Sequence, residues 1–446
     1  MSNPSFGPFD FEQLRKMLEQ LGLGDADNLN LEDLVAQVSK MQASGGGLMF
    51  GMTPADRDPE AAWRTTLTAA KHLAAESGGD PSLRPEELSA VVDAERLAQS
   101  WLTPVVSFPE TGRPARAITK SAWLDETGDG WRAVIEPIID GLADALQRGN
   151  VLGEQDEQLQ PFAQMMGPMM KQSASLIYRD RLKRELSKVA GDILTGTEIG
   201  FNLLGSSDVV VIPANVAQFT RDLDASDTDV TLYLLLREAA RQRLFHSVGW
   251  LSPQLSALLG HYAREITIDF DAIAESLRPE NFEELTMEDM VAVGEQVRGS
   301  FFQPASTPTQ MEILERLEVL LALVEGWVDH VAGRAAGPWM PNAPQLEEVL
   351  HRRRGSATPV TSVFTELLGL DLRPRLVRDA KNLWAAVEHE RGADGRDAVW
   401  GHPDLLPGKA HLADPLAFAK GQGSQQPEED EMDAELRRLL EGDSGD

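Results

Sequence analysis

Cysteine is absent from the 446 residues, and long apolar runs are absent as well. Without cysteine there can be no disulfide, no thiolate nucleophile and no zinc site that uses sulfur, so any metal must bind through nitrogen and oxygen. No apolar run approaches the roughly 20 residues that a membrane helix requires. The first twenty residues lack a basic stretch followed by an apolar one, so they do not resemble a secretory signal, and we expect a cytoplasmic protein.

Basic residues are scarce. The chain has 41 lysines and arginines against 71 aspartates and glutamates, which gives a formal charge of −30. Because this field repels phosphate groups, we expect no nucleic-acid partner and no binding to anionic membrane surfaces. A basic or uncharged peptide or protein is the expected kind of partner. The sequence does not indicate an oligomeric state.

Several common catalytic motifs are also missing. We find no G-x-G-x-x-G after a predicted strand, no Walker loop and no G-x-S-x-G nucleophile elbow. Dinucleotide binding of the Rossmann type, P-loop phosphate binding and α/β-hydrolase chemistry therefore have no support in the sequence.

The pattern of apolar residues predicts a mainly helical protein. Its 42% hydrophobic residues can supply a sizeable core. We predict a flexible leader with a short amphipathic helix over 1–54, a mainly helical domain over 55–420 with a possible subdomain at 55–150, and an acidic disordered tail over 421–446. The stretch 208–216 contains the best strand candidate, a short β-branched run that Pro213 ends.

The stretch 233–251, "YLLLREAARQRLFHSVGWL", contains the pattern R-E-x-x-R. At 100° per residue, Arg237 and Arg241 project from nearly the same face of a helix, and Glu238 lies about a third of a turn away. In zinc peptidases with H-E-x-x-H, histidines at the two positions that are arginine here bind the metal, and the glutamate acts as general base. Alone, R-E-x-x-R is typical of a charged surface or capping cluster.

Four further stretches, between roughly residues 190 and 418, occur together with this one: "VVVIPANVAQF", "LLALVEGWVDHV", "LLGLDLRPRLVRDAKNLWAAV" and "GRDAVWGHPDLLP". In this order they resemble the actinobacterial zincin-like family often labelled zinc-dependent metallopeptidases, which includes a branch associated with coenzyme F420 biosynthesis. The resemblance implies a mainly α zincin-like fold in which the motif helix faces a later helix. That later helix would supply Glu325 as a third metal ligand, with Asp329 as its neighbour.

The sequence departs from this family at both histidine positions. A guanidinium stays protonated and offers no lone pair, so neither Arg237 nor Arg241 can bind Zn²⁺. Glu325 alone would bind a metal weakly, whereas catalytic zinc normally has three protein ligands, so we expect no metal cofactor. A rearranged site formed by His261, Glu325 and His330 is an alternative. His246 is turned too far around the helix to replace either ligand.

A second use of this geometry is charge pairing. Glu318, Glu325 and Asp329 form one acidic stripe, because spacings of seven and four bring them within about 40° of each other. Two arginines carry the same charge of +2 as a zinc ion held by neutral histidines. We therefore hypothesise that Arg237 and Arg241 pair with Glu325 and Asp329, so that charge-assisted hydrogen bonds replace a metal bridge.

Three functions follow from this sequence. The first is a non-catalytic pseudo-peptidase that binds a peptide or protein in the former substrate cleft. The second is an active hydrolase with rearranged metal ligands or a metal-free mechanism, in which Glu238 is the general base. The third is a scaffold that acts through its amphipathic terminal segments.

Overall fold

The computed structural model describes residues 58–148, 178–221, 223–265, 307–368 and 376–421. The chain divides into two compact units, Met1–Arg64 and Thr65–Asp446. The described part of the first unit, 58–64, contains the start of helix α3 (Pro59–Glu76). The expected leader at 1–54, and all of the expected tail at 421–446 except its first residue, lie outside the described residues.

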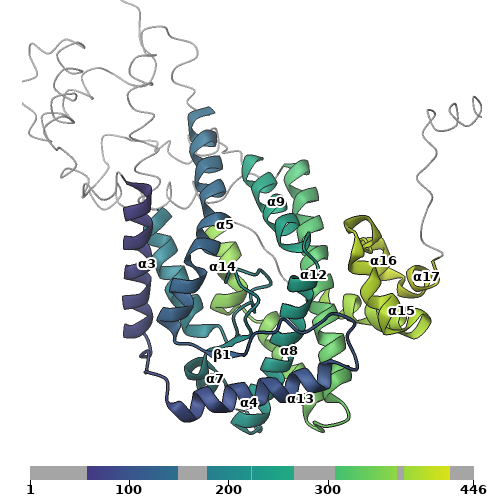
Figure 1. Ribbon diagram of the computed structural model, residues 1–446. Helices are drawn as coiled ribbons and strands as arrows, with labels where there is room; N and C mark the ends of the chain where they lie inside the picture. The colour runs from purple at the N-terminus through teal and green to yellow at the C-terminus, as the bar shows by residue number, and fades with distance from the viewer. Residues whose placement is uncertain (1–57, 149–177, 222, 266–306, 369–375, 422–446) are drawn as a thin grey trace, which may run out of the picture. The chain divides into compact units, whose positions relative to one another are not determined.

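The fold is mainly helical, as the sequence predicts (Figure 1). After α3, the described helices are α4 (Pro85–Leu102), α5 (Lys120–Arg148), α7 (Pro213–Thr220), α8 (Asp227–Ser247), α9 (Leu251–Arg264), α12 (Pro308–Ala336), α13 (Ala343–Gly355), α14 (Pro359–Leu368), α15 (Val377–Ala398), α16 (Lys409–Ala413) and α17 (Pro415–Ala419). Two 3-10 turns, Val399–Gly401 and Pro403–Leu405, follow α15.

Strands are few and short. β1 (Arg116–Ala117) pairs in parallel with β2 (Val210–Val211), and Thr195 adds an antiparallel bridge to Val211. The strand predicted within 208–216 is thus confirmed at Val210–Val211, and Pro213 ends it by starting α7. This small sheet fixes the backbone just before residue 197.

Helix α8 is buried along most of its length. Ser226 caps its N-terminus by accepting a hydrogen bond from the Asp229 backbone N–H at 3.0 Å. From there, every residue from Leu232 to Phe245 is buried, including four charged ones. A helix that is buried on all sides needs partners for its charges from the neighbouring helices.

Helix α12 supplies the partners of two of these charges, Arg237 and Arg241. Thr307 and Gln310 form a reciprocal capping box at its start. The helix packs against α8 on one side and α15 on another, so the expected facing pair of helices is confirmed. Gly326 permits the close approach of α15, because a Cβ there would lie 2.6 Å from the Ala380 Cβ.

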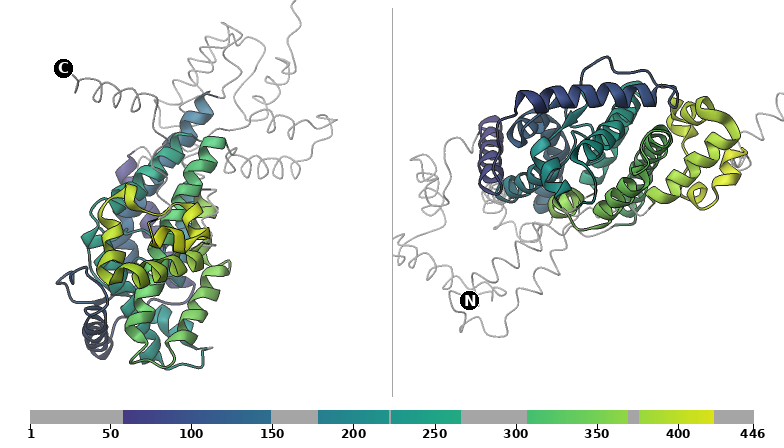
Figure 2. Two further views of the ribbon diagram at one scale, coloured as in Figure 1. Left: turned by 90° about the vertical axis from the view of Figure 1, so that its right-hand side faces the viewer. Right: turned by 90° about the horizontal axis from the view of Figure 1, so that it is seen from below.

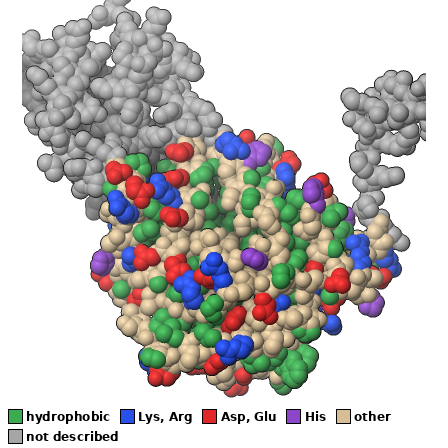
Figure 3. Space-filling view, in the orientation of Figure 1, with side chains coloured by type: hydrophobic (Ala, Val, Ile, Leu, Met, Phe, Trp, Pro, Cys, Tyr) green, Lys and Arg blue, Asp and Glu red, His purple; other side chains and the backbone are tan. Residues whose placement is uncertain are grey.

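The C-terminal helices lie together at one side of α12. Figure 2 shows α15, α16 and α17 grouped beside it, and α15 packs against both shorter helices. On the face drawn in Figure 3, acidic, basic and hydrophobic side chains are interspersed over the described residues. None of the described helices has both the length and the apolar character needed to cross a bilayer.

Candidate functional site

The two arginines of R-E-x-x-R point from α8 to the acidic residues of α12. Arg241 forms a fork on Glu325, with Nε donating to Oε1 at 2.8 Å and Nη2 donating to Oε2 at 3.0 Å. Arg237 donates to Asp329 through Nη1 and to Glu325 through Nη2 at 3.2 Å. The pairing predicted from the helical spacing is therefore confirmed. All four side chains are buried.

A third guanidinium, which no sequence pattern indicates, completes the network. Arg354, in the last turn of α13, donates from Nη1 to Glu325 at 2.9 Å and from Nη2 to Asp329 at 2.6 Å. It belongs to the run "RRR" at 352–354, whose members look alike in the sequence. Burial separates them, because the Arg354 side chain is 15% exposed and that of Arg352 is 76% exposed.

Glu238, the general base of the active-hydrolase alternative, is fully buried and engaged at both oxygens. Its Oε1 accepts hydrogen bonds from the Thr197 hydroxyl at 2.8 Å and the Gln242 amide at 3.1 Å. Its Oε2 accepts from Arg241 Nη1 at 2.8 Å. Thr197 reaches this position because the Gly196 N–H bonds to the Val210 carbonyl, which fixes the preceding backbone against β2. The Thr197 contact was also missed from the sequence.

The charges of this network balance. Three guanidinium groups, those of Arg237, Arg241 and Arg354, face three carboxylates, those of Glu238, Glu325 and Asp329. Burial alone raises the pKa of Glu325 and Asp329, but the guanidinium groups outweigh burial and hold the pKa of both carboxyls below the ordinary value, that of Asp329 well below it. Both carboxylates are thus ionised at neutral pH, as buried partners of arginine must be.

His351 extends the network along α13. Its Nε2 lies 3.0 Å from Asp329 Oδ2 and 3.4 Å from Glu347 Oε1, and Glu347 also pairs with Lys381 of α15. Hydrogen bonds to Asp329 and Glu347 raise the pKa of His351, although burial and Arg354 oppose them. Within the described residues, one set of three acidic or histidine side chains lies close enough together to share a metal ion, namely Asp329, Glu347 and His351. Their oxygens are already shared with arginine and lysine, so we assign no metal to them.

The contact of His351 predicts a pH dependence of stability. A histidine whose pKa is raised in the folded state stabilises the protein fully below its unfolded pKa, near 6.5, and this contribution is lost as pH rises through the folded value. In the wild type, we expect this loss to lower the melting temperature as pH rises above 6.5. In His351→Gln, which lacks the titrating group, this part of the decrease should be absent. Each unit of raised pKa corresponds to about 1.4 kcal/mol.

Differential scanning calorimetry of both proteins from pH 6 to about 9 checks the His351 prediction. Burial lowers the pKa of His330, so His330 acts in the opposite sense and below pH 6.5. The pH ranges in which His351 and His330 change the stability therefore do not overlap. Parallel curves for wild type and variant above pH 6.5 would contradict the assignment.

The rearranged metal site is not assembled. His261, Glu325 and His330 form no cluster of ligand atoms, because His330 Nε2 contacts Glu388 of α15 instead. His246 lies near the end of α8, where its Nδ1 is 3.0 Å from the Ser207 hydroxyl, in agreement with its expected orientation away from the motif.

A small pocket adjoins the network. Its volume is about 80 Å³, well below the roughly 300–1,000 Å³ of sites for drug-sized ligands, so it suits a single side chain. The lining comes from α12, α13, α14 and the segment before β2, and includes Glu198, Ile199, Glu318, Leu321, Glu325, Arg353, Arg354, Val360 and Phe364. Glu318 thus lies at the pocket, two turns before Glu325.

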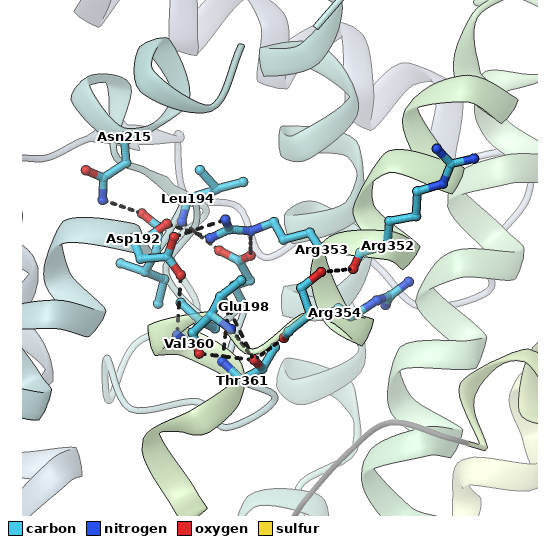
Figure 4. A network of polar contacts seen from close by, with 12 residues as sticks. Asp192, Leu194, Glu198, Asn215, Arg352, Arg353, Arg354, Val360 and Thr361 are labelled. Atoms are coloured by element: carbon cyan, nitrogen blue, oxygen red, sulfur yellow. Dashed lines mark hydrogen bonds and ion pairs between the residues drawn. The ribbon is translucent and has the colours of Figure 1, made fainter. Parts of the chain in front are cut away.

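Arg353 forms one wall of this pocket. It donates from Nε to Glu198 at 3.0 Å and from Nη1 to Asp192 at 3.0 Å, and its guanidinium lies over the Phe219 ring. Figure 4 shows Arg353 reaching toward Asp192 and Glu198 while Arg352 points away. Adjacent arginines of α13 therefore serve different neighbours, and Arg353 holds the segment before β2 against the helix.

Comparison with known proteins agrees with this architecture. The profile of the family described as zincin-like metallopeptidase matches residues 62–419. The chain belongs to this family. A solved structure described as a "putative hydrolase with a novel fold" from Chloroflexus aurantiacus is similar, with a TM-score of 0.56 and 18% sequence identity over 81% of this zincin-like chain and 99% of that one. At this identity the likeness shows the fold. No match was found among curated proteins.

The zinc ion that gives such families their name does not fit the residues of this zincin-like protein. Zinc requires lone pairs from nitrogen, sulfur or oxygen, typically from three protein ligands at a catalytic centre. Arg237 and Arg241 present only N–H donors where α8 faces α12, and both already bind the Glu325 carboxylate. We therefore derive no catalytic step through a metal.

Proposed function

We propose that this protein is a non-catalytic member of the zincin-like family and that it acts by binding a peptide or protein. The observation that carries the proposal is the position of Arg237 and Arg241. They stand at the spacing of the two histidines of H-E-x-x-H, and both are turned toward Glu325, the position of the third metal ligand. Two guanidinium charges supply the +2 that a zinc ion would bring, so the fold can be retained without the metal.

The state of Glu238 further supports a loss of hydrolysis. A general base needs a lone pair directed at the water that it activates. Here Thr197, Gln242 and Arg241 donate to both of its oxygens, and the side chain has no exposed surface. Glu238 thus joins α8 to the segment before β2, and its role is structural.

A binding role is supported by the pocket beside Glu325. It is of a size for one side chain, and its walls include Leu321, Val360 and Phe364. The chain's charge of −30 favours a basic partner over an acidic one. The scaffold alternative depends on terminal segments that lie outside the described residues, so no observed contact favours it.

Hydrolysis of a mixed peptide library, with and without added Zn²⁺, tests the loss of catalysis. We expect wild type and Glu238→Gln to release the same background amount of product, because Glu238 activates no water. The library is analysed by mass spectrometry, and thermolysin serves as a positive control. Peptide cleavage by wild type that Glu238→Gln abolishes would contradict the proposal and favour an active hydrolase.

A further inference from the structure

Arg354 differs from the other two guanidinium groups of the network in how it reaches the carboxylates. Arg237 and Arg241 come from α8 and are buried on all sides, whereas Arg354 comes from α13 and lines the pocket. Its side chain is the most exposed of the three, at 15% against 6% and 3%. Of the three guanidinium groups, Arg354 is therefore the one that lines the pocket and can meet a molecule bound there.

We propose that Arg354 occupies a guanidinium site of its own protein, and that an arginine side chain of a partner peptide takes the same site by exchange. This inference rests on the proposed peptide-binding function and names the chemistry of the partner. The site consists of Glu325 Oε2 and Asp329 Oδ2, which Arg354 bridges with its two terminal nitrogens at 2.9 and 2.6 Å.

Exchange of one guanidinium for another keeps the buried charges paired. Removal of Arg354 alone leaves three carboxylates against two guanidinium groups, which is unfavourable in a buried site. An incoming arginine restores the balance and supplies a donor to each of Glu325 and Asp329. Lysine cannot do the same, since its ammonium is a compact charge without the planar fork that spans two carboxylates. The site should therefore prefer arginine.

The pocket provides both the route and the room for an arginine side chain. Glu318, Glu325 and Arg354 line it together with apolar residues such as Leu321 and Phe364. Such walls suit the methylene stem of an arginine, whose charged end would then meet Glu325. The charge of −30 on the chain also attracts a basic peptide toward the protein.

Arg354 is placed where it can leave without disturbing the buried face of α13. It lies in the last turn of the helix, before Gly355, and a Cβ at Gly355 would meet nothing within 4 Å. The helix is anchored instead through its buried Leu346 and Leu350 and through the Arg353 contacts to Asp192. Rotation of the Arg354 side chain is thus sufficient to open the site.

Calorimetric titration with N-acetyl-arginine methylamide tests the exchange. We expect Arg354→Ala to bind this probe at least about tenfold more tightly than wild type, because the variant lacks the internal competitor that fills the site. The citrulline counterpart has the same shape without the charge, and we expect it not to bind. The lysine counterpart should bind more weakly than the arginine probe.

Two further variants keep this test decisive. Arg352→Ala removes one charge from the same helical turn, but Arg352 does not line the pocket and its side chain pairs with Glu348 instead, so this variant should bind the probe like wild type. If near-ultraviolet circular dichroism shows that Arg354→Ala is unfolded, Arg354→Lys replaces it, since lysine retains one charge but leaves one carboxylate open. It too should bind the probe more tightly than wild type.

Equal affinity of wild type and the Arg354 variant, or equal binding of arginine and citrulline probes, would overturn the exchange. The zinc content of the same preparations separates this result from a failure of the proposed function. Metal-free protein that ignores the probe contradicts the exchange alone. Protein that holds zinc contradicts the non-catalytic assignment, whatever the probe does.

Discussion

Arg241→Met is expected to lower the free energy of unfolding by about 3–5 kcal/mol, which is the usual cost of removing one partner of a buried ion pair. Arg241 forms the fork on Glu325 and also donates to Glu238. Without it, three buried carboxylates share two guanidinium groups, and Glu238 loses a donor. Urea denaturation followed by tryptophan fluorescence measures the change.

Replacing both partners should cost less than replacing one. In Arg241→Met with Glu325→Gln, two guanidinium groups face two carboxylates, so no buried charge is left in excess. Arg352→Met is the matched control. Its side chain is 76% exposed, and we expect a change within about 0.5 kcal/mol. An Arg241→Met variant as stable as this control would show that the network does not stabilise the fold.

The double variant Arg237→His with Arg241→His should bind one zinc ion per chain, where wild type binds none. The substitutions restore H-E-x-x-H on a buried helix that already faces Glu325, so three ligands of the kinds that zinc prefers come together. Without metal this variant has lost two guanidinium charges beside Glu325 and Asp329. It should therefore melt well below wild type, and added zinc should raise its melting temperature.

The control for this experiment is the same double variant with Glu325→Gln. It lacks the carboxylate that would complete the set of three, so its melting temperature should respond much less to zinc. Equal zinc binding by wild type and the double histidine variant would contradict the account, because it would place a metal site elsewhere in the chain.

The central contact of the site could be predicted from the sequence because it depends on helical spacing within two segments. Arg237 and Arg241 lie one turn apart, as do Glu325 and Asp329, so each pair had to lie on one helical face. When two such helices are buried, they pack favourably with the basic face of one against the acidic face of the other, because each buried charge then has a partner. The resemblance to a zincin-like family indicated that the two helices face each other, and the structure agrees.

The remaining contacts could not be read from the sequence because they depend on how distant helices are rotated. Arg352, Arg353 and Arg354 are consecutive and identical, and only the packing of α13 against α12 decides which of them reaches Glu325. Thr197 is a similar case. Its hydroxyl reaches Glu238 because the neighbouring Gly196 N–H is hydrogen-bonded to the Val210 carbonyl of β2. Neither position belongs to a motif with its own spacing.

The metal content of the unmodified protein tests the central claim most directly. The protein is purified without a histidine tag, equilibrated with Zn²⁺, dialysed and analysed by elemental mass spectrometry. If guanidinium groups occupy the place of the metal, zinc should be close to zero per chain. One zinc per chain would mean that the protein has metal ligands other than the residues assigned here, and would contradict the replacement of the metal by Arg237 and Arg241.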